Sequence, residues 1–492
     1  MSVRKPVQVE NSKPSARPKK TYPVKKKRSR SPHWFLIGLG LSGIAMLSAT
    51  AGALLAITLS SKPLQFESST SETDTTFNQE EEISQSPPLQ LPKLTRPVNV
   101  LVLGTKVLSS DLGRSPDDVG YHTLVDDSFD GATDAMLLLR FDPDNNSVTM
   151  LSIPRDTKVN LPDDGTVKIN AVNRLGGVSS SAKATSNLLA GVEIDRYVRV
   201  NVQGVQQLVD ALDGVEMYVP KDMKYRDDSQ HFYIDLEKGQ QTLNGEEAMQ
   251  FLRFRYDEYG DIGRVQRQQL LLRAMVQQAL NPSTLARLPE IFSVIQSNVD
   301  TNLRVQELLA LAGFASDRDQ ENLEMLMLPG EFEDVKNGPN GETTSYWLPH
   351  RREIERMMAR HFEVESNRIR SSSSDEVSPR IRIAIQDSTD NNQAVRGVAR
   401  ELEKDGFRNV YVASPWSEPL ETTRIVAQTG RVEAAKAVAE ILGVGEVRVE
   451  STGALDSVVS IQLGKDWLEK QESEEANSNI RSPQSSNQSL HR

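Results

Sequence analysis

The stretch Trp34–Leu59 is almost wholly apolar or small, and no charged residue occurs between Ser31 and Ser61. At about 1.5 Å of rise per residue, a helix of this length spans a bilayer with some tilt. A cleaved signal peptide is the rival interpretation, because Ala49-Thr50-Ala51 resembles a small-residue cleavage site. The apolar run continues past that point and follows a long basic segment, so we expect a retained transmembrane helix over residues 34–60.

Charge is divided unequally along the chain. Residues 1–33 hold eleven Lys or Arg and a single acid, Glu10, whereas the whole chain of 492 residues has a net charge of -11. Basic residues beside a span stay on the cytoplasmic side. We therefore predict a single-pass cell-membrane protein with a cytoplasmic N-terminus and an acidic extracytoplasmic bulk, for which nucleic acid is a poor partner. The absence of cysteine excludes disulfides, thiolate zinc sites and cysteine nucleophiles.

Composition and periodicity divide the chain further. We predict a basic tail (1–33), the span (34–60), an extended linker (61–96), a folded domain (97–364), a second linker (365–379), a small α/β domain (380–468) and a disordered tail (469–492). Helix and strand signals alternate in the larger domain, which predicts an α/β or α+β fold with a mixed central sheet flanked by helices.

Individual elements follow from apolar spacing. Strands are expected at Val98–Leu103, Asp134–Phe141, Val148–Ile153, Tyr197–Val200, Val215–Val219, Arg380–Ile385, Asn409–Ala413 and Val458–Leu463. Helices are expected at Ser179–Ala190, Gln203–Leu212, Glu246–Phe254, Arg264–Leu280, Val305–Phe314, Ala394–Lys404 and Val432–Leu442. The sequence Asn244-Gly245-Glu246-Glu247 has the composition of a helix start.

Four arginines occur within fifteen residues of the stretch Phe251–Gln268, with no lysine among them. They are Arg253, Arg255, Arg264 and Arg267. Guanidinium groups offer planar, bidentate donors that match phosphate oxygens, so this pattern suggests a phosphate site. On a helix Arg264 and Gln268 share a face. The alternative is a set of solvated arginines paired with nearby acids, and spacing alone does not decide between the two.

Two further groups of residues could complete such a site. Ser152 to Thr157, SIPRDT, follows a predicted buried strand, and loops at strand ends often form ligand sites in α/β folds. Arg155 would project from that loop, or would pair with Asp156 in an ordinary surface turn. Asp126, Asp127, Asp130 and Asp134 precede or open a strand, where carboxylates could hold Mg²⁺ (or Mn²⁺). Asp134 is the strongest candidate, because it opens an otherwise apolar strand.

Six motifs in order resemble those of the LytR-CpsA-Psr family of membrane-anchored cell-envelope enzymes. They are DAMLLLRFDP, SIPRDT, KINAVNRLGG, LVDALDGVEMYVP, LNGEEAMQFLRFRY and GDIGRVQRQQ, and the resemblance runs from about Val98 to Phe362. Residues 380–468 resemble the LytR C-terminal domain. The resemblance implies a phosphotransferase that moves a glycopolymer phosphate from a polyprenyl-pyrophosphate carrier to peptidoglycan, with a possible pyrophosphatase side activity.

The resemblance also implies roles for individual residues. Arg155, Arg253, Arg255, Arg264 and Gln268 would surround the pyrophosphate, with Lys168 and Arg267 binding substrate and Asp134 and Asp130 on Mg²⁺. The lipid tail would enter an apolar pocket between Leu270–Leu288 and Val305–Leu311, unless these are ordinary core helices. Family members commonly have Arg two residues before the metal Asp, where this chain has Ala132. That departure motivates an alternative, a non-catalytic protein that binds polyprenyl pyrophosphate in the envelope.

Overall fold

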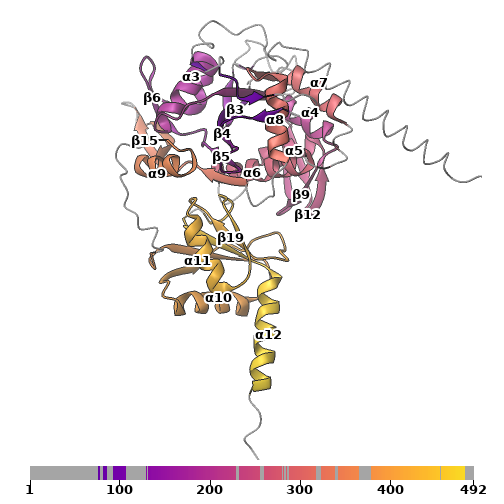
Figure 1. Cartoon of the computed structure of the whole chain (residues 1–492), viewed down its shortest axis with the longest axis vertical. Coiled ribbons are helices and arrows are strands. Elements are labelled where there is room, and N and C mark those ends of the chain that lie inside the picture. The colour runs from indigo at the N-terminus through magenta and orange to yellow at the C-terminus, as the bar shows by residue number, and fades with distance from the viewer. Residues whose placement is uncertain are drawn as a thin grey trace, which may run out of the picture. The chain divides into compact units, whose positions relative to one another are not determined.

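A computed structural model describes several ranges of the chain (Figure 1). The described residues are 76–77, 81–85, 92–106, 129, 131–228, 232–254, 260–279, 281, 284, 287–316, 323–337, 342–364, 378–454 and 456–481. The predicted basic tail and transmembrane helix, residues 1–60, lie outside them. Within the described ranges, no helix is both long enough and apolar enough to cross a membrane.

A six-stranded mixed sheet forms the centre of the large region, by which we mean the described residues from 76 to 364. Its strand order is β13-β8-β3-β4-β5-β14. These strands are β3 (Val98–Lys106), β4 (Ala132–Asp142), β5 (Ser147–Ser152), β8 (Arg196–Asn201), β13 (Val299–Thr301) and β14 (Leu323–Met327). β3 is antiparallel to β4 and parallel to β8, and β14 is parallel to β5. The predicted mixed central sheet is therefore confirmed.

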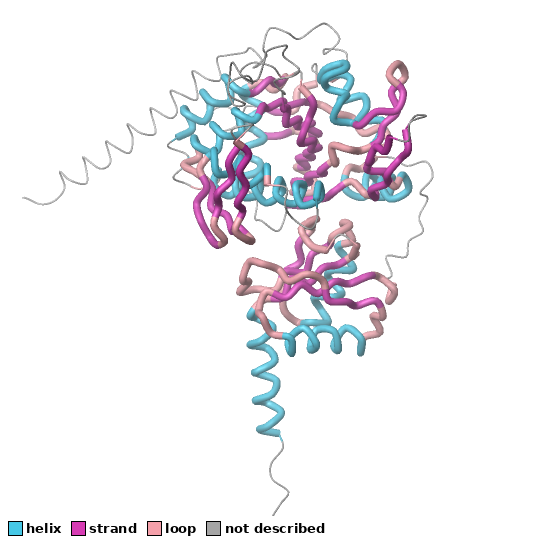
Figure 2. The backbone as a smooth tube through the Cα atoms, turned by 180° about the vertical axis from the view of Figure 1, so that it is seen from behind, coloured by secondary structure: helices cyan, strands magenta, loops and turns pink. Residues whose placement is uncertain are grey.

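Helices cover both faces of this sheet (Figures 1 and 2). Leu101 and Leu103 of β3 belong to a buried cluster that includes residues of α3 (Val172–Leu188) and α9 (Arg351–His361). Val98 and Val100, which point the opposite way because side chains alternate along a strand, belong to a second cluster with α8 (Val305–Ser316). Burial on both faces explains why β3 is apolar along most of its length.

The remaining elements surround these layers. They are β1 (Ser84–Gln85), β2 (Lys93–Leu94), β6 (Lys158–Leu161), β7 (Gly165–Lys168), the 3-10 helix η2 (Ile169–Ala171), α4 (Val202–Ala211), β9 (Val215–Val219), β10 (Met223–Asp227), β11 (Phe232–Leu236), β12 (Gly239–Leu243), α5 (Gly245–Arg253), α6 (Gly260–Ala279), α7 (Leu288–Asn298), β15 (Gly330–Asn337) and β16 (Glu342–Pro349). The predicted helix start at Asn244 is confirmed, since Asn244 and Glu247 form a reciprocal capping box.

A second sheet, ordered β18-β17-β21-β19-β20, forms the C-terminal region (the described residues 378–481). Its elements are β17 (Arg382–Asp387), α10 (Asn392–Lys404), β18 (Asn409–Val412), β19 (Arg424–Ala427), α11 (Val432–Leu442), β20 (Glu446–Arg448), β21 (Val459–Leu463) and α12 (Lys465–Arg481). The predicted disorder from Glu469 is wrong as far as Arg481. Lys470 holds the first part of α12, because its ammonium group lies over the Trp467 ring, donates to the carbonyl of Leu442 and pairs with Glu474 one turn later.

Candidate functional site

A small recess lies where the ends of β4, β5 and β14 meet helix α6. Its lining is Asp134, Ile153, Pro154, Arg155, Asp156, Arg264, Val265, Gln268, Met327 and Phe332. The space inside is about 20 Å³, enough for about one water molecule. Four of the predicted site residues therefore come together here from three separate parts of the sequence, namely Asp134, Arg155, Arg264 and Gln268.

Charged side chains form a continuous network along one wall of the recess. Arg155 Nη1 lies 2.9 Å from Asp134 Oδ1, and Arg155 Nε lies 3.5 Å from Asp156 Oδ2. Lys168 Nζ lies 2.8 Å from the other oxygen of Asp156. The side chain of Asp156 is 9% exposed, whereas that of Asp134 is 34% exposed. Asp156 is thus a buried anchor that orients both cations, and Asp134 is the carboxylate that an incoming ligand can reach.

Helix α6 supplies the opposite wall. Arg264 and Gln268 are four residues apart, so they lie one above the other on one face of the helix. The amide of Gln268 donates a hydrogen bond to the backbone carbonyl of Asp134, at 3.3 Å. Arg264 lines the recess and is only 9% exposed. Arg264 and Gln268 therefore both line the recess.

The other predicted arginines have different positions. Arg267 Nη2 donates a hydrogen bond to the carbonyl of Phe254, the residue that follows α5, and Arg253 is the last residue of α5. Among the described residues, neither these two arginines nor Lys168 lines the recess itself. Lys168 is joined to it through Asp156. Arg255 and Asp130 lie outside the described residues, as do Asp126 and Asp127.

The donor set suits a magnesium ion only in part. Within the described ranges, no group of three or more His, Asp or Glu side chains gathers into a metal site. Mg²⁺, however, is commonly held by one or two carboxylates together with substrate phosphates and water. Asp134, which is partly exposed at the edge of the recess, is one such carboxylate, and it pairs with Arg155.

Several residues of the site were not predicted from the sequence. Met327 and Phe332 line the recess, and the Tyr346 ring lies 5.8 Å from Lys168 Nζ. All three belong to β14, β15 or β16, for which the sequence analysis predicted no strand. A signal exists for Tyr346, because ETTSYWLP, the sequence of β16, is rich in threonine and aromatic residues, which favour strands.

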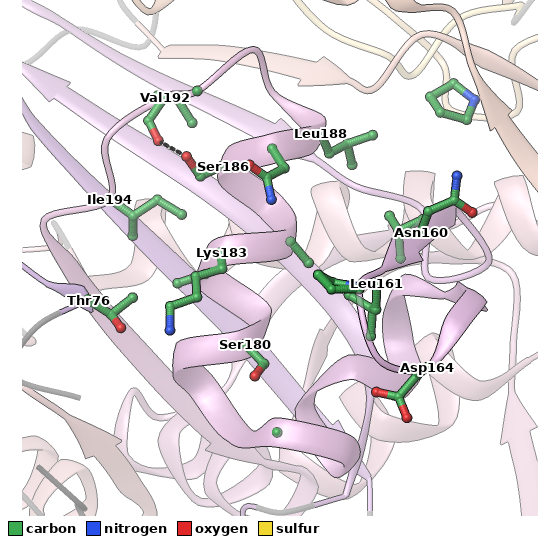
Figure 3. A pocket seen from close by; sticks show the side chains of 18 of the residues that line it. Thr76, Asn160, Leu161, Asp164, Ser180, Lys183, Ser186, Leu188, Val192 and Ile194 are labelled. Carbon is green, nitrogen blue, oxygen red and sulfur yellow. Dashed lines mark hydrogen bonds between the residues drawn. The ribbon is translucent and has the colours of Figure 1, made fainter. Parts of the chain in front are cut away.

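A much larger cavity, of about 1070 Å³, lies beside α3 (Figure 3). Ser186, one of its lining residues, donates a hydrogen bond to the carbonyl of Val192. Its charged lining is balanced, with cations Lys158, Lys183 and Arg351 and carboxylates Asp163, Asp164 and Glu193. Among the described residues, none of the predicted site residues lines this cavity, whereas four of them line the recess.

The segments expected to hold a lipid tail contribute to hydrophobic cores. Leu271 and Ala274 of α6 pack in a cluster with Phe251, and Leu311 of α8 packs in the cluster that includes Val98. This is the arrangement of ordinary core helices.

Comparison with known proteins gives consistent matches. The model of the LytR-CpsA-Psr family matches residues 61–363, and the model described as LytR cell envelope-related transcriptional attenuator matches residues 380–467. Polyisoprenyl-teichoic acid--peptidoglycan teichoic acid transferase TagV of Bacillus subtilis is 34% identical over 234 residues, which is 46% of this chain and 58% of TagV. This chain therefore spans less than two thirds of TagV.

The transferase TagU of Bacillus cereus is 31% identical over 274 residues, 55% of this chain and 80% of TagU. The crystal structure of B. subtilis TagV aligns with a TM-score of 0.44 and 29% identity, covering 55% of this chain and 99% of that one. Because the family match extends over more than half of the sequence, the chain belongs to the LytR-CpsA-Psr family.

Proposed function

We propose that this chain transfers a glycopolymer phosphate from a polyprenyl-pyrophosphate carrier to peptidoglycan. The observation that carries the proposal is the recess in which Arg155, Arg264, Gln268 and Asp134 converge. Family membership and the transferase activities for which TagV and TagU are named support the same reaction class. Phosphoryl transfer needs positioning and charge stabilisation rather than a covalent nucleophile. Arginine, glutamine and aspartate side chains can provide both.

The proposed step is a displacement at phosphorus. A sugar hydroxyl of the acceptor forms a new P–O bond to the polymer-linked phosphorus, and the bond to the bridging oxygen breaks. Polyprenyl phosphate leaves with that bond's electron pair, and the hydroxyl proton passes to water. Arg155 and Arg264 hold the phosphate oxygens where negative charge accumulates, while Gln268 fixes the backbone of Asp134 through its carbonyl.

Asp134 is the residue we propose as the carboxylate ligand of Mg²⁺ or Mn²⁺, with Asp130 as the second. A bound divalent ion supplies charge neutralisation at the pyrophosphate oxygens. With such an ion on Asp134, Arg155, which pairs with Asp134 at 2.9 Å, would contact the phosphates. Asp156 orients Arg155 and Lys168, because its carboxylate pairs with both cations.

The proposed location is the outer side of the cytoplasmic membrane. The apolar run Trp34–Leu59 and the eleven basic residues before His33 support a single span with a cytoplasmic N-terminus. Both substrates of the proposed reaction then meet the large region at the membrane surface.

The test uses the full chain in proteoliposomes with a short glycan on polyprenyl pyrophosphate, a peptidoglycan fragment and Mg²⁺. We expect phosphate-linked glycan on the acceptor and free polyprenyl phosphate. Arg264→Ala should lower turnover by about 10²- to 10³-fold, the usual effect of removing one stabilising donor. Arg264→Lys should restore only part of it, because an ammonium group lacks the bidentate geometry.

A non-catalytic binding protein is the second candidate, and Ala132 is the observation that favours it. Ala132 begins β4, two residues before Asp134, where the family resemblance implies an arginine, so the chain offers no cation at this position. Binding of the lipid pyrophosphate without any metal-dependent product would favour this candidate and rule out the transferase.

A further inference from the structure

We propose that the C-terminal region braces helix α6 and strand β14, and so positions the site residues that they carry. The inference rests on the proposed function of the recess. It concerns a contact segment, Val449–Gly453, that follows β20 in the C-terminal region. The positioning residues are Gln266 and Arg273 on α6 and Glu450 on the contact segment.

The contact segment is polar but almost fully buried. Glu450, Ser451 and Thr452 are 4%, 1% and 5% exposed. Polar groups are buried at such levels only where they are bonded, and these bonds include ones to the large region. Glu450 forms an ion pair with Arg273 of α6. Gln266 of α6 donates to the carbonyls of Ser451 and Gly453, at 3.3 and 3.1 Å.

The same segment covers the outer edge of β14. This strand ends the six-stranded sheet, with β5 on its inner side. On the outer side, the N–H of Met325 donates to the carbonyl of Val449 at 2.7 Å, and the hydroxyl of Ser451 lies 3.4 Å from the carbonyl of Met325. A main-chain hydrogen bond of this kind holds the edge strand against the contact segment and covers part of its unpaired N–H and C=O groups.

The brace and the recess use opposite sides of α6. Gln266 and Arg273 are two and nine residues from Arg264, which at 3.6 residues per turn places both about half a turn away from it. Gln269, also on the rear side, donates to the carbonyl of Leu326 in β14 at 3.3 Å. The rear of α6 is therefore fixed to β14 and to the contact segment, while Arg264 and Gln268 face the recess.

Both braced elements line the recess, α6 through Arg264, Val265 and Gln268 and β14 through Met327. A shift of α6 by a fraction of an ångström would separate Gln268 from the Asp134 carbonyl and move Arg264 away from a bound phosphate. Positioning of this kind affects the rate of the chemical step more than folding, because misplaced donors stabilise the transition state less.

The experiment compares two glutamines on one helix in the full chain. Gln266→Ala removes the bonds to the contact segment. Gln278→Ala, the matched control, removes a bond to the carbonyl of Leu212, inside the large region. Glu450→Gln is the second test variant, because it removes the charge facing Arg273 and preserves the side-chain shape. Measurements are amide hydrogen exchange of α6 and β14, kcat and KM separately, and the midpoint of thermal unfolding.

We expect Gln266→Ala and Glu450→Gln to accelerate exchange in α6 and to lower kcat by roughly 2- to 30-fold, with the unfolding midpoint of the large region unchanged. Gln278→Ala should leave kcat at the wild-type value. Unchanged exchange in α6, or faster exchange with wild-type kcat, overturns the brace. A wild-type chain without turnover overturns the proposed function instead, and the exchange rates then decide the brace by themselves.

Discussion

Arg155 lies between the carboxylates of Asp134 and Asp156, so part of the charge at the recess is already neutralised. Together with Arg264 and Lys168 it opposes Asp134 and Asp156, which makes three cations against two carboxylates among the described residues of the site. A pyrophosphate brings more negative charge than this excess can neutralise. Additional cations, from a metal ion or from other side chains, therefore decide how tightly it is held.

Ala132→Arg should strengthen the site. Residue 132 is two positions before Asp134 at the start of β4, so the long, flexible side chain of an arginine there could reach a ligand at Asp134. We expect tighter binding of polyprenyl pyrophosphate and a rise in turnover of up to about 10²-fold. Ala132→Gln, of similar length without charge, is the control. Equal binding by both variants, measured by calorimetry, would contradict this account.

Local and long-range features of the site differ in how far they could be predicted. The shared face of Arg264 and Gln268 follows from helical spacing, and it is present in the structure. The pairing of Arg155 with Asp134 depends on β4 and β5 being neighbours in the sheet, which spacing does not reveal. The sequence left open whether Arg155 pairs with Asp156, and in the structure it faces both carboxylates.

At the scale of elements, strong periodicity predicted boundaries well. β9 and α11 have the predicted limits, Val215–Val219 and Val432–Leu442. β14 was missed because Leu323–Met327 is a short apolar run, which spacing does not distinguish from a helix segment. The hairpins β6–β7 and β15–β16 were missed because their strands are mainly polar and are stabilised by pairing with each other.

Gly177 kinks helix α3, and alanine there should destabilise the fold. Its φ of 66° and ψ of -163° belong to a region that only glycine adopts readily. A Cβ at this position would meet no atom within 4 Å, so the whole effect comes from the backbone. We expect Gly177→Ala to lower the free energy of unfolding by about 1–3 kcal/mol in urea titrations.

Gly313 in α8 is the matched control, because a Cβ there also meets nothing within 4 Å. Gly313→Ala should raise the free energy of unfolding, by up to about 1 kcal/mol, since alanine favours a helix. Equal effects of the two substitutions would show that backbone conformation at Gly177 is not the cause.

Glu324 of β14 makes the stability of the fold depend on pH. Burial by itself raises the pKa of Glu324, but the hydrogen bond and charge of His361, together with the bond from Thr149, outweigh it and hold the pKa below its ordinary value of 4.5. A carboxyl group whose pKa is lower in the folded state stabilises the fold above about pH 4.5. This contribution to the free energy of unfolding is lost as pH falls through the pKa of the folded state.

Glu324→Gln should therefore make the free energy of unfolding fall less steeply between about pH 6 and pH 3. Glu353→Gln, at an exposed carboxylate that faces His350, is the control and should leave the slope unchanged. Urea titrations across the pH range provide the measurement. A slope for Glu324→Gln equal to that of the wild type would exclude this contribution.

At the scale of the whole molecule, the two sheets have separate hydrophobic cores. Leu138 and Leu151 belong to one core, Ile383 and Ile461 to the other, and Val449 packs against both. The C-terminal region could be predicted as a unit, since α10, α11 and the strands β17, β18 and β21 follow from the sequence. The bonds between this region and α6 could not be predicted, because Glu450-Ser451-Thr452 has the composition of an ordinary polar loop.

Ile461→Ala should destabilise the C-terminal region selectively. Ile461 is fully buried, and removing its side chain leaves a cavity that costs about 2–5 kcal/mol. We expect faster hydrogen exchange in β17 and β19, which flank β21, and a smaller acceleration in α6, with β3 and β4 unaffected. Leu138→Ala should give the reverse pattern. Uniform acceleration across both sheets would mean that they unfold as one unit.

The covered edge of β14 also has a consequence for solubility. The main-chain bond from Met325 to Val449 occupies an edge that would otherwise offer unpaired N–H and C=O groups to other molecules. A chain shortened before Ser378 would expose that edge, and two copies could pair along it. Self-association of shortened forms is therefore expected, and it would lower the amount of active protein by a route separate from any change at Arg264 or Gln268.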